Sequence, residues 1–224
     1  MNTARAATIV LEKEIRAEMR TRELLQTTII FTVIVVTLFN FAFEPTAEEA
    51  RRIGPGLIWI TLLFAGSLML NPTFVREQAN DTIYALRTSP AGPFAIVLGK
   101  TLANLIFMGI TEVILVPVFA VLYNVSLVSV LGRLALVLLL GTFGLVVVGT
   151  VFSAVAAQAR MRELLLPILL LPVLIPLLFA AVEATAGLLS DSPALDRTWI
   201  SVLIAFDVLF FTVSWLLCDY LLEE

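Results

Sequence analysis

Six long apolar runs alternate with short polar stretches along this chain. A lipid core about 30 Å thick is crossed by roughly 20 helical residues. Because lipid offers the backbone no hydrogen bonds, each run is expected to be helical. The predicted spans cover residues 24–43, 57–75, 101–123, 134–154, 164–183 and 199–218. The pattern therefore predicts an all-α membrane protein in which residues 1–224 form a single transmembrane domain.

Residues 3–23, ahead of the first span, are more polar and show helical periodicity. Apolar or small side chains recur at three- and four-residue steps and form one stripe, made of Ala4, Thr8, Leu11, Ile15 and Met19. A helix with one apolar face that leads directly into a span is expected to lie in the membrane interface.

Composition agrees with a membrane protein and excludes several functions. The chain is 60% hydrophobic and only 14% charged, whereas soluble domains are about 25% charged. The net charge of −4 leaves no basic surface for nucleic acid. With one cysteine and no histidine, the chain offers neither an internal disulfide nor a histidine-based metal, haem or catalytic site. We expect no catalytic residue, no metal site and no cofactor bound by this chain alone.

The distribution of Lys and Arg predicts the orientation. If both termini lie on one side of six spans, that side carries ten of these residues and the other side four. Cytoplasmic loops are the ones enriched in Lys and Arg, so both termini are expected in the cytoplasm. The segment 76–93, which joins the second and third spans, is then cytoplasmic as well.

The segment 76–93 reads REQANDTIYALRTSPAGP and is longer than a bare connection requires. Two helical turns are expected within it, capped by Asn80 or Asp81 and ended by Pro90. Its expected apolar patch is formed by Ile83, Leu86 and Tyr84, and Glu77 and Arg87 are expected at the charged rim of that patch. We therefore expect this segment to dock on a cytoplasmic partner.

Gly99-Lys100-Thr101 resembles the end of a phosphate-binding P-loop. The motif GxxxxGK[ST] requires glycine where this chain has Phe94. Pro93 opens a helix that enters the membrane, and no strand precedes it. The sequence therefore predicts no nucleotide site here, and Lys100 is expected to extend its ammonium to the lipid headgroups.

Several intramembrane positions are candidates for function. Glu112 and Asp207 lie near the middle of the third and sixth spans, where an acid is costly and usually faces the bundle interior. They are either carboxylates on a substrate or proton path, or protonated acids that hold helices together.

Pro167, Pro172 and Pro176 in the fifth span are either hinges or ordinary membrane-helix prolines. Glycines are expected to serve helix packing in the fourth span, at Gly141, Gly144 and Gly149. A helix break is expected at Gly54-Pro55-Gly56.

These features together resemble the membrane subunits of ABC-2-type transporters. Their loop after the second span commonly reads RE…(G)T…L…SP…L..K. The matching residues here are Arg76, Glu77, Thr82, Leu86, Ser89, Pro90, Leu98 and Lys100. Within that superfamily the whole chain is similar to the haem exporter protein B (CcmB) family, the permease subunit of cytochrome c maturation system I. That similarity is carried by TLF, IGPGLIWI, LGK and LLLPVLIPLLFAA. The chain departs from the family at Asn80-Asp81, often Asp-Gly, and at LFNF, often Leu-Phe-Pro-Leu.

The resemblance implies a non-catalytic permease of the bacterial inner membrane. Its partners would be a cytoplasmic ABC ATPase, a second copy of itself, a haem-handling membrane protein and a small membrane subunit. ATP hydrolysis would drive release of a haem-loaded periplasmic chaperone, with haem handled by the complex. The ATPase-coupling residues would be Glu77, Asp81, Thr82, Ile83, Leu86, Arg87, Ser89 and Pro90. Three alternatives stay open: an ABC-2-type permease for another hydrophobic cargo, a proton-coupled secondary transporter using Glu112, and a scaffold that only gathers partners.

Overall fold

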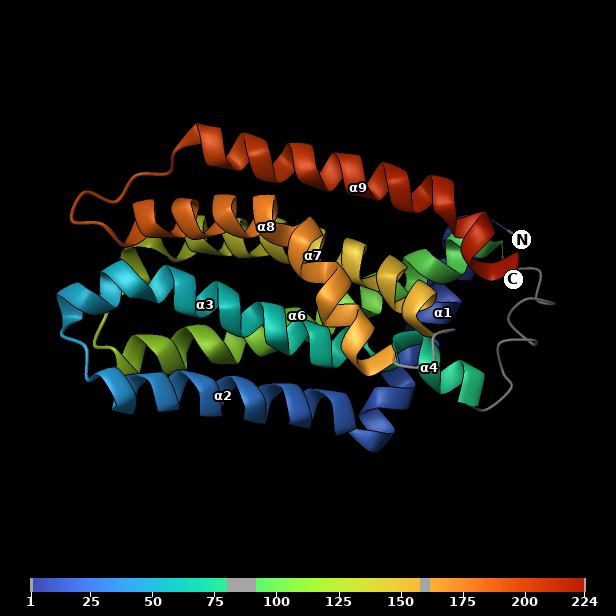
Figure 1. The fold of residues 1–224 in the computed structure, drawn as a ribbon, viewed down its shortest axis with the longest axis horizontal. Coiled ribbons are helices and arrows are strands. Elements are labelled where there is room, and N and C mark those ends of the chain that lie inside the picture. The colour runs from blue at the N-terminus through green and yellow to red at the C-terminus, as the bar shows by residue number, and fades with distance from the viewer. Residues whose placement is uncertain (1, 80–91, 158–161, 224) are drawn as a thin grey trace.

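The computed structural model describes residues 2–79, 92–157 and 162–223, and within these ranges every regular element is helical (Figure 1). Side chains are described except at 76–79, 162–165 and 219–223. The elements are α1 (Thr3–Thr21), α2 (Glu23–Phe43), α3 (Ala47–Leu70), α4 (Pro72–Ala79), α6 (Pro93–Leu122), the short 3₁₀ helix η1 (Val128–Val130), α7 (Leu131–Ala157), α8 (Arg162–Leu189) and α9 (Arg197–Glu223). Six helices in the described ranges are long and apolar enough to cross a membrane. The prediction of an all-α protein with six membrane-spanning helices is therefore confirmed.

Helix α3 begins ten residues before the predicted second span and runs through the expected break. Thr46 and Glu49 form a capping box: each side chain accepts a hydrogen bond from the other residue's backbone N–H. The helix then continues past Pro55, as membrane helices do when neighbours support them. Gly54 gives the Phe119 ring the space that a side chain would fill. The prediction of a break at Gly54-Pro55-Gly56 is wrong because capping and packing outweigh the local signal.

Both chain termini lie at one end of the elongated bundle, together with α1 and α4 (Figure 1). The connections from α2 to α3, from α6 to α7 and from α8 to α9 lie at the opposite end. The structure therefore places every lysine and arginine of α1 at one end, and Arg51, Arg133 and Arg197 at the other.

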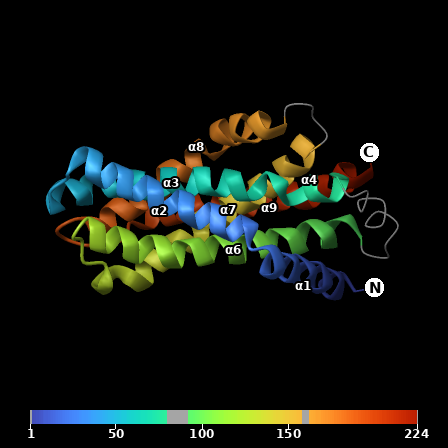
Figure 2. The ribbon, with the colours of Figure 1, turned by 90° about the horizontal axis from the view of Figure 1, so that it is seen from below.

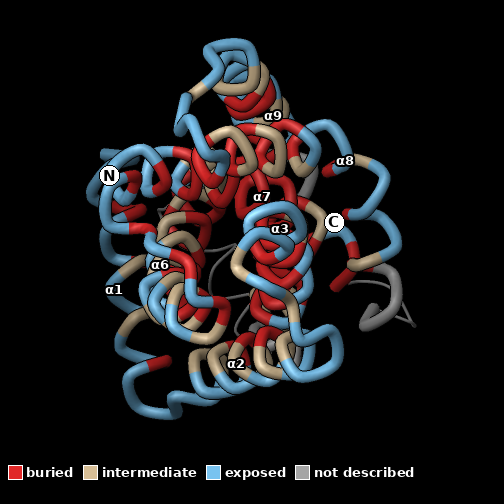
Figure 3. The backbone as a smooth tube through the Cα atoms, turned by 90° about the vertical axis from the view of Figure 1, so that its left-hand side faces the viewer, coloured by how far each residue is buried: buried red, intermediate tan, exposed pale blue. Residues whose placement is uncertain are grey.

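Helices α3 and α7 form the centre of the bundle. About 72% of the apolar window of α3 and 67% of that of α7 are buried, against 17% for α2 and 22% for α9. Figure 3 shows this contrast, with buried backbone concentrated on α3 and α7 and exposed faces on α2 and α9. The outer faces are apolar and suit contact with lipid.

A buried tryptophan links three helices near this centre. The Trp59 indole N–H on α3 donates to the Thr185 hydroxyl on α8 at 3.0 Å. The indole ring fills the space beside Gly141 on α7, where a Cβ atom would lie 2.1 Å from it. Gly144 and Gly149 of α7 likewise accommodate Asp207 and Leu70. The expectation that the glycines of the fourth span serve packing agrees with this geometry.

Helix α1 packs along the first turns of α6 (Figure 2). Its buried residues are Ala6, Ala7, Val10 and Glu18. Ala4, Thr8 and Met19 of the predicted stripe stay exposed, and Leu11 and Ile15 are half-buried. The helix therefore uses a second face, not read from the sequence, to contact the protein, and presents most of the predicted stripe outward.

Candidate functional site

The predicted coupling residues are only partly within the described structure. Glu77 lies in α4, and its side chain is not described. The others lie outside the described residues: Asp81, Thr82, Ile83, Leu86, Arg87, Ser89 and Pro90. What the structure does describe are the two helices that flank them, α4 and α6, and their attachment to the rest of the protein.

Helix α4 follows α3 after a single turn residue, Asn71. Pro72 occupies the first position of α4, where a missing N–H is harmless and the proline φ suits a helix. Thr73 and Phe74 in the first turn of α4 face the start of α6. These first-turn residues are the point at which the predicted coupling segment is attached to the bundle.

Lys100 of α6 is buried at this point, with 1% of its side chain exposed. Its ammonium donates to Glu14 Oε1 of α1 at 2.9 Å and to the Thr73 carbonyl of α4 at 2.7 Å. It also lies 4.9 Å from the centre of the Phe74 ring, within reach of a cation–π interaction. We call Glu14, Thr73, Phe74 and Lys100 the Lys100 junction. The prediction that Lys100 extends to the headgroups is wrong, because an acid, a carbonyl and a ring receive it inside the protein.

Electrostatics at the junction favour the charged form of Glu14. Burial raises the pKa of this carboxyl, but Lys100 and the neighbouring Lys13 outweigh burial, through charge and hydrogen bonds. The pKa of Glu14 therefore falls below its usual value of 4.5. At neutral pH the junction contains a carboxylate facing a buried ammonium.

Gly99 explains how α1 reaches this position. A Cβ atom at Gly99 would lie 2.7 Å from the Ala7 carbonyl oxygen and 2.7 Å from Val10 Cβ. The absence of a side chain lets the two helix backbones approach closely. The sequence Gly99-Lys100-Thr101 thus builds a helix contact followed by an ion pair, and Thr101 bonds to the Val97 carbonyl of its own helix.

Asn104, one turn beyond Lys100, extends the junction to α7. Its amide group lies 3.3 Å from the Thr73 hydroxyl and 3.4 Å from the Thr150 hydroxyl. Asn104 and Thr150 are both buried. Thr73 is consequently held at its backbone by Lys100 and at its side chain by Asn104.

The two acids inside the spans have different surroundings. Glu112 of α6 is buried and accepts a hydrogen bond from the Thr142 hydroxyl of α7. Asp207 of α9 is 5% exposed, and neither carboxyl oxygen has a hydrogen-bond partner among the described residues. Its Oδ1 occupies the space beside Gly144 of α7. Both acids face the bundle interior as predicted, but on different helix pairs, so the structure does not combine them into one site.

Helix α8 contains Pro167, Pro172 and Pro176 and is visibly bent (Figures 1 and 2). Each proline removes one backbone N–H from the helix ladder. The bend gives the predicted hinge a structural basis, while a hinge motion stays a prediction.

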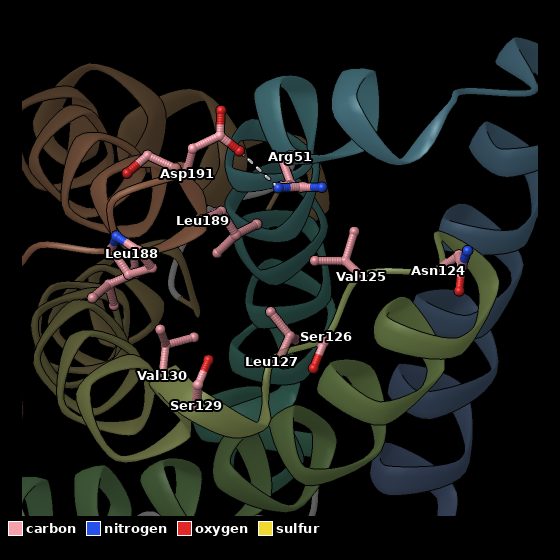
Figure 4. Close-up of a pocket in the computed structure, with 12 residues that line it drawn as sticks. Arg51, Asn124, Val125, Ser126, Leu127, Ser129, Val130, Leu188, Leu189 and Asp191 are labelled. Atoms are coloured by element: carbon pink, nitrogen blue, oxygen red, sulfur yellow. Dashed lines mark hydrogen bonds and ion pairs between the residues drawn. The ribbon is translucent and has the colours of Figure 1, made fainter.

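A pocket of about 350 Å³ opens at the opposite end of the bundle (Figure 4). Val125, Leu127 and Leu189 contribute apolar walls, and Arg51 reaches across to Asp191 with a separation of 2.9 Å. With 42% and 97% of these two side chains exposed, water surrounds the pair. The pocket can admit a small amphiphilic group. The Arg51–Asp191 pair in its lining contributes little electrostatic energy because both side chains are exposed to water.

Sequence reasoning missed Glu14, Thr73 and Asn104. Glu14 is one of several charges on α1, and its role depends on a contact with a residue 86 positions away. Asn104 offered a usable signal, since an amide inside an apolar run usually bonds to another helix.

The chain is similar to known proteins over nearly its whole length. The family model described as CcmB protein matches residues 5–218. Heme exporter protein B of Pseudomonas aeruginosa is 30% identical over 198 residues, which cover 88% of each chain. Heme exporter protein B of Rhodobacter capsulatus is 34% identical over 153 residues, or 68% of this chain and 70% of that protein. Heme exporter protein B of Bradyrhizobium diazoefficiens is 28% identical over 184 residues, or 82% of each. With six apolar helices arranged as a bundle, this multi-pass membrane chain belongs to the CcmB protein family.

Proposed function

We propose that this chain is the permease subunit of an ATP-driven complex of the bacterial inner membrane that handles haem for cytochrome c maturation. The observation that carries this proposal is the family match over residues 5–218, together with relatives that are named heme exporter protein B. The described residues form six helices long and apolar enough to span a membrane, all in one bundle, which suits a transport subunit.

The energy source is a separate cytoplasmic ABC ATPase. The chain's Gly99-Lys100-Thr101 packs against α1 rather than cradling phosphate, so ATP binding belongs to a partner. That partner docks on residues 76–90, with Ile83 and Leu86 as apolar anchors and Glu77 and Arg87 at the rim. The placement of α4 and the start of α6 at the same end as both termini supports this arrangement (Figure 1).

The assembly follows from this role. Two copies of the chain sit over two ATPases, with a haem-handling membrane protein and a small membrane subunit alongside. ATP hydrolysis releases a haem-loaded periplasmic chaperone. With no histidine in the sequence, haem ligands come from other subunits. Both termini are cytoplasmic, because the end that carries α1 is the one rich in Lys and Arg.

A pull-down from native membranes tests the docking step. We expect tagged wild-type protein to retain the ATPase, and Leu86→Asp to insert normally but lose it, since a buried apolar anchor becomes charged. The matched control is Ser126→Asp, which adds the same charge on an exposed residue at the opposite end. Retention of the ATPase by Leu86→Asp counts against this interface.

The secondary-transporter alternative rests on Glu112, whose burial beside Thr142 fits a proton carrier as well as a structural acid. Glu112→Gln separates these functions. The ATP-driven permease tolerates the substitution, because the amide also bonds to Thr142, whereas a proton carrier loses all coupled transport. Cytochrome c maturation in cells that carry Glu112→Gln is the measurement.

A further inference from the structure

We propose that α1, α4 and the first turns of α6 form one rigid unit, fastened by the Lys100 junction, so that α1 moves together with the attachment of the coupling segment. The role in coupling rests on the proposed function. The rigid unit itself concerns only this chain and can be tested without any partner.

The first support is that one side chain links three helices, its own and two others. Lys100 belongs to α6, its carboxylate partner Glu14 to α1, and its carbonyl partner Thr73 to α4. The two contacts measure 2.9 and 2.7 Å. A displacement of α4 relative to α6 would therefore stretch a bond to the ammonium that also holds α1.

The second support is burial. Lysine is almost never fully buried unless it is paired. Only 1% of the Lys100 side chain is exposed. Opening the junction in place would part a buried ammonium from the Glu14 carboxylate beside the Phe74 ring. Because breaking a buried ion pair is strongly unfavourable, the three helices are expected to move together rather than separately.

The third support is the shape of the contact between α1 and α6. At Gly99 the Ala7 carbonyl and the Val10 side chain lie where a Cβ atom would stand. Ala7 and Ala95 are also buried against this interface. Helix α1 packs mainly on α6 and less on α2, so this contact is the main one that sets its position.

The consequence is mechanical coupling between α4 and α1. A partner that pushes on α4 also moves α1, whose opposite face, with Ala4, Thr8 and Met19, is exposed. Lys100 is therefore a positioning residue that couples the cytoplasmic attachment to a helix in the membrane interface.

Spin labels test the rigid unit in the purified chain alone. Labels at Ala17→Cys on α1 and Gln78→Cys on α4, in a Cys218→Ser background, are expected to give one narrow distance distribution. Lys100→Met should broaden it, and so should Glu14→Gln, which keeps the buried Lys100 ammonium and removes the carboxylate that faces it. The matched control is Lys13→Met, since Lys13 contacts the same Glu14 carboxylate from the exposed side at 3.3 Å. A broad wild-type distribution, or one that stays narrow in both junction variants, overturns the proposal.

The coupling role is tested with the co-purified ATPase. We expect Lys100→Met and Glu14→Gln to retain the ATPase but to lower cytochrome c maturation about fivefold or more, and Lys13→Met to lower neither. Full maturation in both junction variants overturns the coupling role. If wild-type protein retains no ATPase, the proposed function fails instead, and the label distances still decide whether the unit exists.

Discussion

Two ion pairs, one at each end of the bundle, have the same length and opposite surroundings. Lys100 and Glu14 lie 2.9 Å apart with 1% and 24% of their side chains exposed. Arg51 and Asp191 also lie 2.9 Å apart, with 42% and 97% exposed. Water screens the second pair, whereas the neighbours of the first pair include a carbonyl and an aromatic ring inside the protein. Burial of the ion pair, and not its length, therefore decides at which end of the protein the helices are held together more strongly.

The two ion pairs are also expected to differ in their contribution to folding stability. Exposed pairs contribute about 0–1 kcal/mol to folding, while removing one partner of a buried pair costs about 3–5 kcal/mol. The end with α1 and α4 is thus expected to resist separation of its helices. The end with the pocket is expected to adjust easily.

The largest expected effect is that of Lys100→Met. This substitution leaves Glu14 without its buried cation and removes the Lys100 donor from the Thr73 carbonyl, and should lower the free energy of unfolding by about 3–5 kcal/mol. Denaturant titration of purified protein in detergent measures the loss. The control Lys13→Met removes an exposed contact to the same acid and should cost no more than about 1 kcal/mol. Equal losses in the two variants would mean that burial does not set the strength of the junction.

The next effect concerns the close approach of helices. Gly99→Ala places a Cβ atom 2.7 Å from the Ala7 carbonyl and should destabilise the protein by about 1–3 kcal/mol through overpacking. Gly109→Ala in the same helix has open space around the new atom and should be neutral or stabilising by up to about 1 kcal/mol, because alanine favours helix. Thermal unfolding of the two variants checks the contrast, and destabilisation by both would refute it.

A pH titration tests whether the ionised form of Glu14 stabilises the protein. Because the pKa of Glu14 is lowered in the folded protein, its stabilisation is fully present above the unfolded value of about 4.5. That stabilisation disappears as pH falls through the folded value. The difference in melting temperature between wild type and Glu14→Gln should therefore be constant from pH 7 to pH 5 and shrink below that. A difference that grows on acidification would show that the carboxylate is not the stabilising form.

The smallest effect is expected from Arg51→Met at the other end. The exposed pair with Asp191 should contribute no more than about 1 kcal/mol, and 1 M salt should remove most of it, because the screening length is then about 3 Å. Melting temperatures in low and high salt measure this. A loss as large as that of Lys100→Met would erase the contrast between the two ends.

The membrane-spanning helices were predictable from the sequence because the lipid core restricts which structures can cross it. A membrane core requires long apolar helices, and the composition of each of the six runs met that requirement without reference to its neighbours. The start of α3 was missed because Gly54 and Pro55 signal a break only when no other helix packs on them, and here Phe119 does.

The candidate site was less predictable because its contacts join distant parts of the chain. Lys100 stood out through its motif, but its environment depends on α1 folding back onto α6. Glu112 and Asp207 were both identifiable as acids inside spans. That Glu112 alone has a hydroxyl partner depends on Thr142 on another helix. The coupling segment, residues 76–93, stays a prediction from its sequence.

The Trp59 indole, which links α3, α7 and α8, can also serve as a built-in fluorescence reporter. It is 1% exposed, whereas Trp215 is 56% exposed on the outer face of α9. With Trp199 and Trp215 replaced by phenylalanine, the remaining emission would come from a buried site between three spans. A shift of its wavelength during the transport cycle would record water entry between these helices in real time.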